Sequence, residues 1–121
     1  MARVALVIAL VITLLGVASA AADVSGVWNL DMQWSGRETH STGVCTFKQE
    51  GRTLTGSCAD GHSTIAGEVN DTKLTWRIDV EQEGQRGRMT FEGTLDESGT
   101  KIEGTCATVG GAEGRFTMKK R

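Results

Sequence analysis

The chain of 121 residues has no proline, no tyrosine and no surplus of basic residues. Its 13 Lys and Arg against 15 Asp and Glu give a formal net charge of -2, so it lacks the basic footprint of a nucleic-acid-binding protein. Apolar residues recur along the whole chain with neither a Gly-X-Y nor a heptad period, which excludes collagen, a coiled coil and disorder. The length suits one hydrophobic core and not two. A small β domain remains.

The first 22 residues have the pattern of a targeting segment. A single charge, Arg3, precedes an apolar run over residues 4–17, and small residues follow up to Ala22. We therefore expect a signal peptide over residues 1–22, cleaved after Ala20 or Ala22, and export to the periplasm or the extracellular space. The alternative is an uncleaved anchor, because the run is long enough to span a bilayer. Only in that case do we expect contact with a membrane.

From Asp23 onward, apolar residues alternate with polar ones, which is the two-residue period of a strand with one buried face. The clearest case is residues 74–80, in which every second residue is apolar. Short turns that carry Gly, Asn or Asp separate the segments and predict hairpins. The eight segments have their apolar positions within residues 28–34, 45–47, 54–58, 65–69, 74–80, 89–95, 102–106 and 116–118.

Consecutive hairpins predict an antiparallel meander, and closure of eight strands into a barrel hides the apolar face and both sheet edges. We therefore predict one all-β domain over residues 23–121, an eight-stranded antiparallel up-and-down barrel. A two-sheet sandwich is the alternative, but its crossovers need longer connections than these. Inward glycines at the middle of strands fit the bends of a small barrel: Gly56, Gly67, Gly93 and Gly104.

Three cysteines in a chain expected to be exported predict one disulfide and one free thiol. Cys45 and Cys58 lie on the inward faces of consecutive strands, opposite each other or one diagonal step apart, near the geometric limit for a bridge. Cys106 belongs to the seventh segment, across the barrel, and we expect it to be a buried apolar thiol. The alternative is three reduced core cysteines, because free cysteine is often buried.

The motif Gly26-Val27-Trp28, at the start of the first of eight meander strands, resembles the calycin superfamily of lipocalins, fatty-acid-binding proteins and avidins. With the short hairpins and the strand start Leu54-Thr55-Gly56, the chain looks most like avidin-type barrels and the small lipocalin-like domains of secreted bacterial proteins. The resemblance implies the barrel architecture. It does not extend to biotin, because the chain has no tyrosine for one usual avidin contact.

A second resemblance is to small periplasmic metalloprotease inhibitors of the bacterial Inh type, which are also eight-stranded barrels. It rests on Ser25-Gly26-Val27-Trp28, on Cys45 and Cys58, and on the basic end Lys119-Lys120-Arg121. In that family an N-terminal arm enters the protease cleft, but after the expected cleavage only Asp23 and Val24, with or without Ala21 and Ala22, precede the motif here. This resemblance implies a protein partner, a secreted hydrolase such as a protease or a lysozyme.

In a meander, the connections after the first, third, fifth and seventh strands share one end of the barrel. They include the two longest expected loops, residues 35–43 and 82–87, so we expect the open mouth there. Its expected polar rim consists of Arg37, His40, His62 and Arg86.

We expect no enzyme, because the sequence has no nucleophile elbow, no paired buried carboxylates and no phosphate loop. No metal-ligand spacing is present, and the inward positions are expected to be apolar or glycine, so we expect neither a metal nor a cofactor. The rim residues are then solvated loop residues.

The predicted function is binding of a small apolar or aromatic ligand through the mouth of the barrel. Trp34 and Trp76 offer the best stacking surfaces for a ligand ring. The same side chains are able to fill an eight-stranded barrel completely, and in that case loops or N-terminal residues bind a protein partner. The candidate ligand contacts are Trp28, Trp34, Phe47, Trp76, Phe91 and Phe116.

Overall fold

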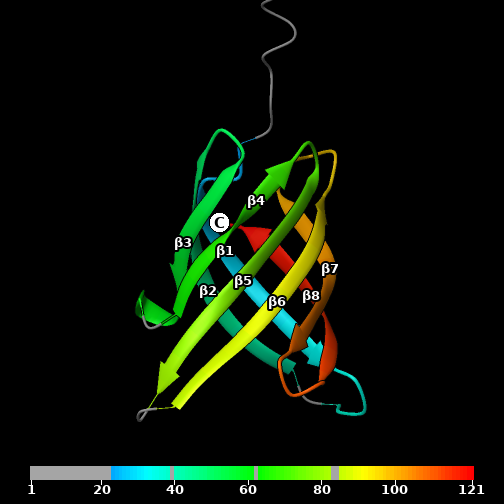
Figure 1. Ribbon diagram of the computed structural model, residues 1–121. Coiled ribbons are helices and arrows are strands. Elements are labelled where there is room, and N and C mark those ends of the chain that lie inside the picture. The colour runs from blue at the N-terminus through cyan, green and yellow to red at the C-terminus, as the bar shows by residue number, and fades with distance from the viewer. Residues whose placement is uncertain (1–22, 39, 62, 83–84) are drawn as a thin grey trace, which may run out of the picture.

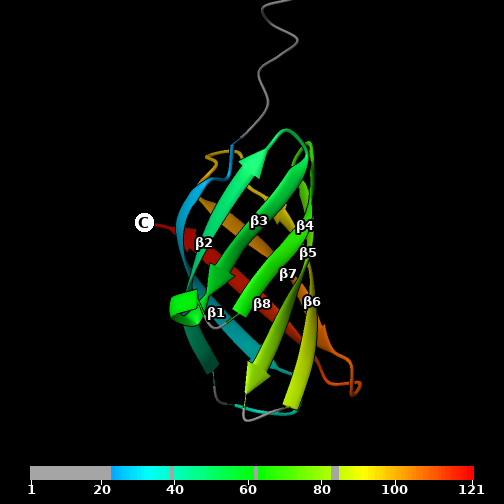
Figure 2. The same cartoon turned by 60° about the vertical axis from the view of Figure 1, so that its left-hand side comes forward.

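The computed structural model describes residues 23–38, 40–61, 63–82 and 85–121. Eight strands follow one another in antiparallel up-and-down order, and β1 pairs with β8 to close the barrel (Figures 1 and 2). This confirms the predicted fold, and the sandwich alternative is wrong. The strands are β1 (Gly26–Trp34), β2 (His40–Glu50), β3 (Thr53–Cys58), β4 (Ser63–Asn70), β5 (Lys73–Gln82), β6 (Gln85–Leu95), β7 (Lys101–Thr108) and β8 (Glu113–Lys120).

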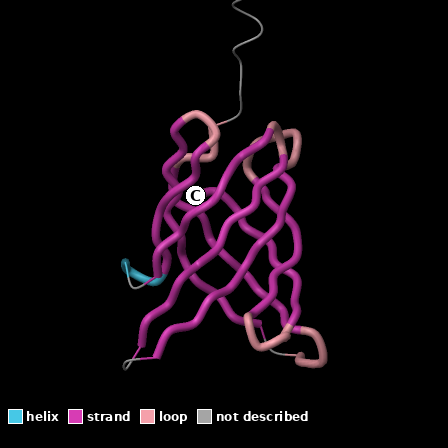
Figure 3. The backbone as a smooth tube through the Cα atoms, in the orientation of Figure 1, coloured by secondary structure: helices cyan, strands magenta, loops and turns pink. Residues whose placement is uncertain are grey.

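The alternation of apolar and polar residues separates the inside of the barrel from the outside. On β1, for example, Trp28 and Leu30 are buried while Asn29 and Asp31 are exposed. Within the described residues, no helix has the length and hydrophobicity needed to cross a membrane. The short helix η1 (Ala59–Gly61) lies to one side of the barrel (Figure 3). The expected signal peptide lies outside the described residues.

Two strands begin earlier than the sequence suggested. Gln33 pairs with His40, and Val80 pairs with Gly87, so β2 and β6 continue through residues expected to be loop. The connections are therefore 35–39 and 83–84 instead of 35–43 and 82–87. Backbone N–H and C=O groups pair between strands whether or not the side chains are apolar. The added residues are polar or glycine, so the alternation of apolar residues does not reveal them. Longer loops therefore do not distinguish the two ends of the barrel.

Inward glycines let large rings lie against a neighbouring strand. Trp76 pairs with Gly67, and Phe116 pairs with Gly104. A Cβ atom on Gly67 would lie 2.1 Å from the carbonyl oxygen of Thr75, so the two backbones approach more closely than any other residue allows. Phe47 pairs in the same way with Gly56, whose φ of 152° also favours glycine. These glycines bend the sheet around a core of aromatic rings.

The start of the described chain closes one end of the barrel. Val24 is fully buried, and its carbonyl oxygen accepts a hydrogen bond of 2.9 Å from Nε1 of Trp28. The N–H of Val24 donates to Oε1 of Gln49 at 2.9 Å. The Nζ atom of Lys120 lies 5.9 Å from the centroid of the Trp28 ring, which is a cation–π distance. We call this the closed end.

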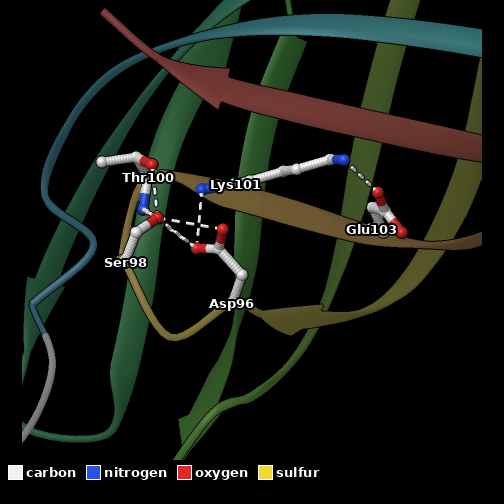
Figure 4. Close-up of polar contacts among 5 residues, drawn as sticks. All are labelled: Asp96, Ser98, Thr100, Lys101 and Glu103. Atoms are coloured by element: carbon white, nitrogen blue, oxygen red, sulfur yellow. Dashed lines mark hydrogen bonds and ion pairs between the residues drawn. The ribbon is translucent and has the colours of Figure 1, made fainter.

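The turn between β6 and β7, also at the closed end, is organised by one carboxylate (Figure 4). Oδ1 of Asp96 accepts hydrogen bonds from the backbone N–H groups of Thr100 and Lys101, both at 3.2 Å. The hydroxyl of Ser98 donates to the same carboxylate at 2.9 Å. Burial raises the pKa of Asp96, but these hydrogen bonds outweigh it and hold the pKa below its ordinary value. The turn is therefore a structural device.

Candidate functional site

Five of the six aromatic candidates form the buried core. Trp76 stacks on Phe91, with ring centroids 5.1 Å apart and planes 4° apart. The rings of Phe47 and Phe116 meet Trp76 edge-on at 5.2 and 5.3 Å. Trp28 packs on Phe47 from the closed end, with centroids 6.2 Å apart. Such pairs stabilise by about 0.5–1.5 kcal/mol each beyond the area they bury. These rings form a floor across the middle of the barrel.

Trp34, the sixth aromatic candidate, is only partly buried and lies at the other end of the barrel. Met32 and Met89 are also partly buried there, and all three side chains pack against the core. Met32 pairs with Phe116, so it lies next to the aromatic floor. We call Met32, Trp34 and Met89 the mouth cluster. It offers one indole surface and two flexible thioethers to a molecule that enters from solvent.

Two inward glycines near the mouth cluster face open space. Gly43 pairs with inward-facing Leu30, and Gly87 pairs with Val80. A Cβ atom at either glycine meets no described atom within 4 Å, apart from its chain neighbours. Their strands, β2 and β6, are four strands apart in the ring of eight and form opposite walls. Among the described residues, there is therefore room for a side chain at both positions, in contrast to the crowded middle of the barrel.

The walls of the mouth differ in height. Figure 1 shows the β5–β6 hairpin extending beyond the neighbouring strands, whereas the wall made by β3 and β4 stops at η1. Gly87 lies on the extended hairpin and is exposed. A ligand can therefore approach along the inner face of β6.

Inward hydroxyl groups at the mouth correct the expectation that every inward position is apolar or glycine. Ser63 pairs with Cys58 and is only 7% exposed. Thr108 pairs with Met89, and its Oγ1 accepts a hydrogen bond of 3.2 Å from the N–H of Ala112. Ser41 pairs with Met32. Extending the two-residue period beyond the last apolar residue would have found all three, at one step for Ser63 and Thr108 and at two steps for Ser41.

Among the described residues, one buried side-chain nitrogen has no hydrogen-bond partner. Nε1 of Trp76 is buried, and no described residue accepts its hydrogen bond. The indole N–H of Trp28, by contrast, donates to Val24. Most buried polar groups in proteins are paired, so this exception calls for an explanation. Trp76 lies between Leu74 and Ile78 on the inward face of β5, and both of these neighbours are apolar.

The structure describes the side chains of two of the expected rim residues, Arg37 and His40. Arg37 is exposed in the turn after β1, where its N–H donates to the carbonyl of Trp34 at 3.1 Å. Nδ1 of His40 lies 2.8 Å from Oδ1 of Asp31, and both side chains are about half exposed on the outer wall. His62 and the side chain of Arg86 lie outside the described residues. Within the described part of the chain, no three His, Cys, Asp or Glu side chains gather as metal ligands.

The predicted disulfide between Cys45 and Cys58 is confirmed. The two residues are direct partners across β2 and β3, with Cα atoms 4.1 Å apart. Cys106 is a free, buried thiol, and burial raises its pKa. The alternative of three reduced cysteines is wrong. The bridge lies one inward step from Phe47, so it fixes the wall between the aromatic floor and the mouth.

Grooves also cross the outer wall of the barrel. One groove, of about 600 Å³, runs over β1, β2 and β8 between the exposed side chains of Asp31, Thr42, Val44 and Lys119. Another, of about 490 Å³, crosses β6, β7 and β8 beside Glu92. The second groove is mainly polar, whereas apolar atoms, including those of Leu30 and Val44, make up much of the lining of the first.

No protein-family model and no curated protein sequence matches this chain. Solved structures of redesigned β-barrels are similar to it. The barrel mFAP1, bound to DFHBI, is 21% identical, with a TM-score of 0.60 over 80% of this chain and 94% of that chain. The barrel b11L5F_LGL is 20% identical, with a TM-score of 0.62 over 85% and 98%. The barrel mFAP0, bound to DFHBI, is 23% identical, with a TM-score of 0.59 over 80% and 98%.

At these identities the likeness shows the fold alone. The chain is an eight-stranded antiparallel up-and-down barrel, with a crowded aromatic floor and one end where apolar side chains remain partly exposed.

Proposed function

We propose that this protein is an exported, non-catalytic barrel that binds a small apolar or aromatic ligand at its mouth. The observation that carries the proposal is the mouth cluster: Met32, Trp34 and Met89 stay partly exposed above the aromatic floor, beside the open space at Gly43 and Gly87. Covering exposed apolar surface with a ligand is favourable, because it removes that surface from water.

Two further observations support the proposal. Redesigned barrels of the same fold have been solved with the small aromatic dye DFHBI bound. The Cys45–Cys58 disulfide suits an oxidising compartment, as expected for an exported protein.

Trp34 is the residue through which the ligand contact is best tested. An indole face gives a ligand ring a large, rigid contact at small entropic cost, and truncation of a central aromatic contact commonly costs about 2 kcal/mol or more. The variant Trp34→Ala should therefore weaken binding about thirty-fold. Val44→Ala is the matched control, because Val44 is 38% exposed on the outer wall of the adjacent strand.

The experiment is a titration of the protein with an apolar dye and a panel of aromatic compounds, followed by tryptophan fluorescence. We expect saturable binding with a stoichiometry near one, weakened about thirty-fold in Trp34→Ala and unchanged in Val44→Ala. Gly43→Leu should also weaken binding, because its side chain would occupy open space while the barrel stays folded. Circular dichroism checks the fold of each variant. No saturable binding to the folded protein would overturn the proposal.

A further inference from the structure

The unpartnered indole of Trp76 suggests which ligands the mouth selects. Its ring is 4% exposed, and no described residue accepts from Nε1. Its near neighbours are hydrocarbon: Phe91 on one face, with Phe47 and Phe116 at the edges. A buried donor without an acceptor costs free energy, and an acceptor brought in by a ligand would recover it.

The wall of the barrel above Trp76 leaves a route for such an acceptor. On β6, the inward positions from the floor toward the mouth are Phe91, Met89 and Gly87. Met89 is partly buried and unbranched, so it can change rotamer at small cost. Gly87 has no side chain, and a Cβ atom placed there would meet no described atom within 4 Å. A flat molecule moving along β6 therefore meets the flexible side chain of Met89, with its buried partner Ile78 on β5, before it reaches the edge of the Trp76–Phe91 stack.

The surroundings of Nε1 favour a neutral acceptor over a charged one. The described inward side chains at the level of the stack carry no positive charge, and the inward hydroxyls of Ser63 and Thr108 lie nearer the mouth. A carboxylate taken to this depth would lose its hydration and gain a single N–H donor. A carbonyl oxygen or a ring nitrogen loses far less hydration and accepts the same hydrogen bond.

We infer that the ligand is a flat aromatic molecule with a neutral hydrogen-bond acceptor at its leading end, and that Nε1 of Trp76 donates to that acceptor. The inference rests on the proposed function, since it places the ligand in the same mouth. Trp34 and Met89 then bind the rest of the molecule, and Trp76 sets its chemical class.

Three probes of similar shape test the inference: naphthyl methyl ketone, isopropenylnaphthalene and naphthoate. The ketone carries a neutral acceptor, the alkene carries none, and naphthoate is charged. We expect the ketone to bind about five-fold more tightly than the alkene, the usual net gain from one hydrogen bond, and naphthoate to bind more weakly than the ketone. In Trp76→Phe, the ratio between ketone and alkene should fall about five-fold while the alkene still binds.

Heteronuclear NMR of the unaltered protein gives a second readout that does not depend on the folding of Trp76→Phe. The indole N–H signal of Trp76 should move on addition of the ketone and much less with the alkene. The indole N–H of Trp28, already bonded to Val24, is the internal control.

The possible outcomes separate the two proposals. Saturable binding of ketone and alkene with equal affinity, and a Trp76 signal that both move equally, would overturn the inference and leave the mouth site standing. Tighter binding of naphthoate than of the ketone would overturn the inference that the acceptor is neutral. No saturable binding of any probe would overturn the mouth site itself, and the inference with it.

Discussion

Replacing Gly104 with alanine should destabilise the barrel strongly, because the new methyl group would meet the backbone of the adjacent strand. The added Cβ would lie 1.8 Å from the carbonyl oxygen of Glu92 and 2.6 Å from Cα of Gly93. No side-chain rotation relieves overlap with backbone atoms, so β6 and β7 would have to move apart. Overpacking of this kind costs about 3 kcal/mol, at the upper end of the usual range.

Gly43→Ala is the matched control, since it adds the same methyl group to another inward glycine. There the Cβ meets no described atom within 4 Å beyond its chain neighbours, and the backbone is not in the left-handed region. Reduced freedom of the unfolded chain should stabilise this variant by about 0.5 kcal/mol. The two variants should therefore differ by about 3.5 kcal/mol, or roughly 15–25 °C in Tm for a domain of this size.

Urea unfolding followed by tryptophan fluorescence, with the disulfide intact, gives the free energy of unfolding of each variant. The slope against urea should stay unchanged, which would show that the same surface is exposed on unfolding. A loss below about 1 kcal/mol for Gly104→Ala, or equal losses for both variants, would refute the idea that close backbone approach requires these glycines.

Three further predictions concern the cysteines and the Asp96 turn. Removing the disulfide with Cys45→Ala and Cys58→Ala should lower the free energy of unfolding by about 3 kcal/mol in urea, because the bridge restricts the unfolded chain; an unchanged value would contradict this. Burial raises the pKa of the Cys106 thiol. Its contribution to the free energy of unfolding is therefore complete below the pKa of the unfolded thiol, about 8.5, and is lost as the pH rises through its pKa in the folded protein. The alkaline fall in Tm should accordingly be smaller in Cys106→Ala, and identical falls would contradict it. The pKa of Asp96 is lowered in the folded protein. Its contribution to the free energy of unfolding is therefore present above the pKa of the unfolded carboxyl, about 3.9, and is lost as the pH falls through the pKa of the folded protein. The fall in Tm at acid pH should therefore be smaller in Asp96→Asn than in the unaltered protein. An equal fall in the two proteins would contradict the role of the Asp96 carboxylate in the turn.

The sequence was sufficient to predict which face of each strand points inward. Alternation assigns a residue to a face, and for this reason the barrel, the inward aromatic residues and the Cys45–Cys58 bridge could all be predicted. Alternation carries no information about depth along the barrel axis, which depends on the tilt and stagger of the strands. Trp34 at the mouth and Phe116 in the floor therefore looked alike in the sequence.

Polar residues that continue a strand were the other source of error. His40 and Ser41 extend β2, and Ser63 begins β4, although none of them adds to the apolar pattern. The ladder there depends on the register set by neighbouring strands, which only the closed barrel defines. The missing partner of Trp76 could not be predicted either, since it depends on which side chains surround the ring.

Both ends of the described chain lie at the closed end of the barrel. Anything joined to either terminus is therefore held at that end. The N–H of Arg121 donates to the carbonyl of Val27 at 2.9 Å, so β1 begins beside the point where β8 ends. A fusion partner, a lipid or a solid support joined before Asp23 or after Arg121 leaves from the end opposite the mouth. A tethered barrel therefore presents its mouth outward. A short linker between the two ends would give a circular permutant that could be opened at residues 109–112.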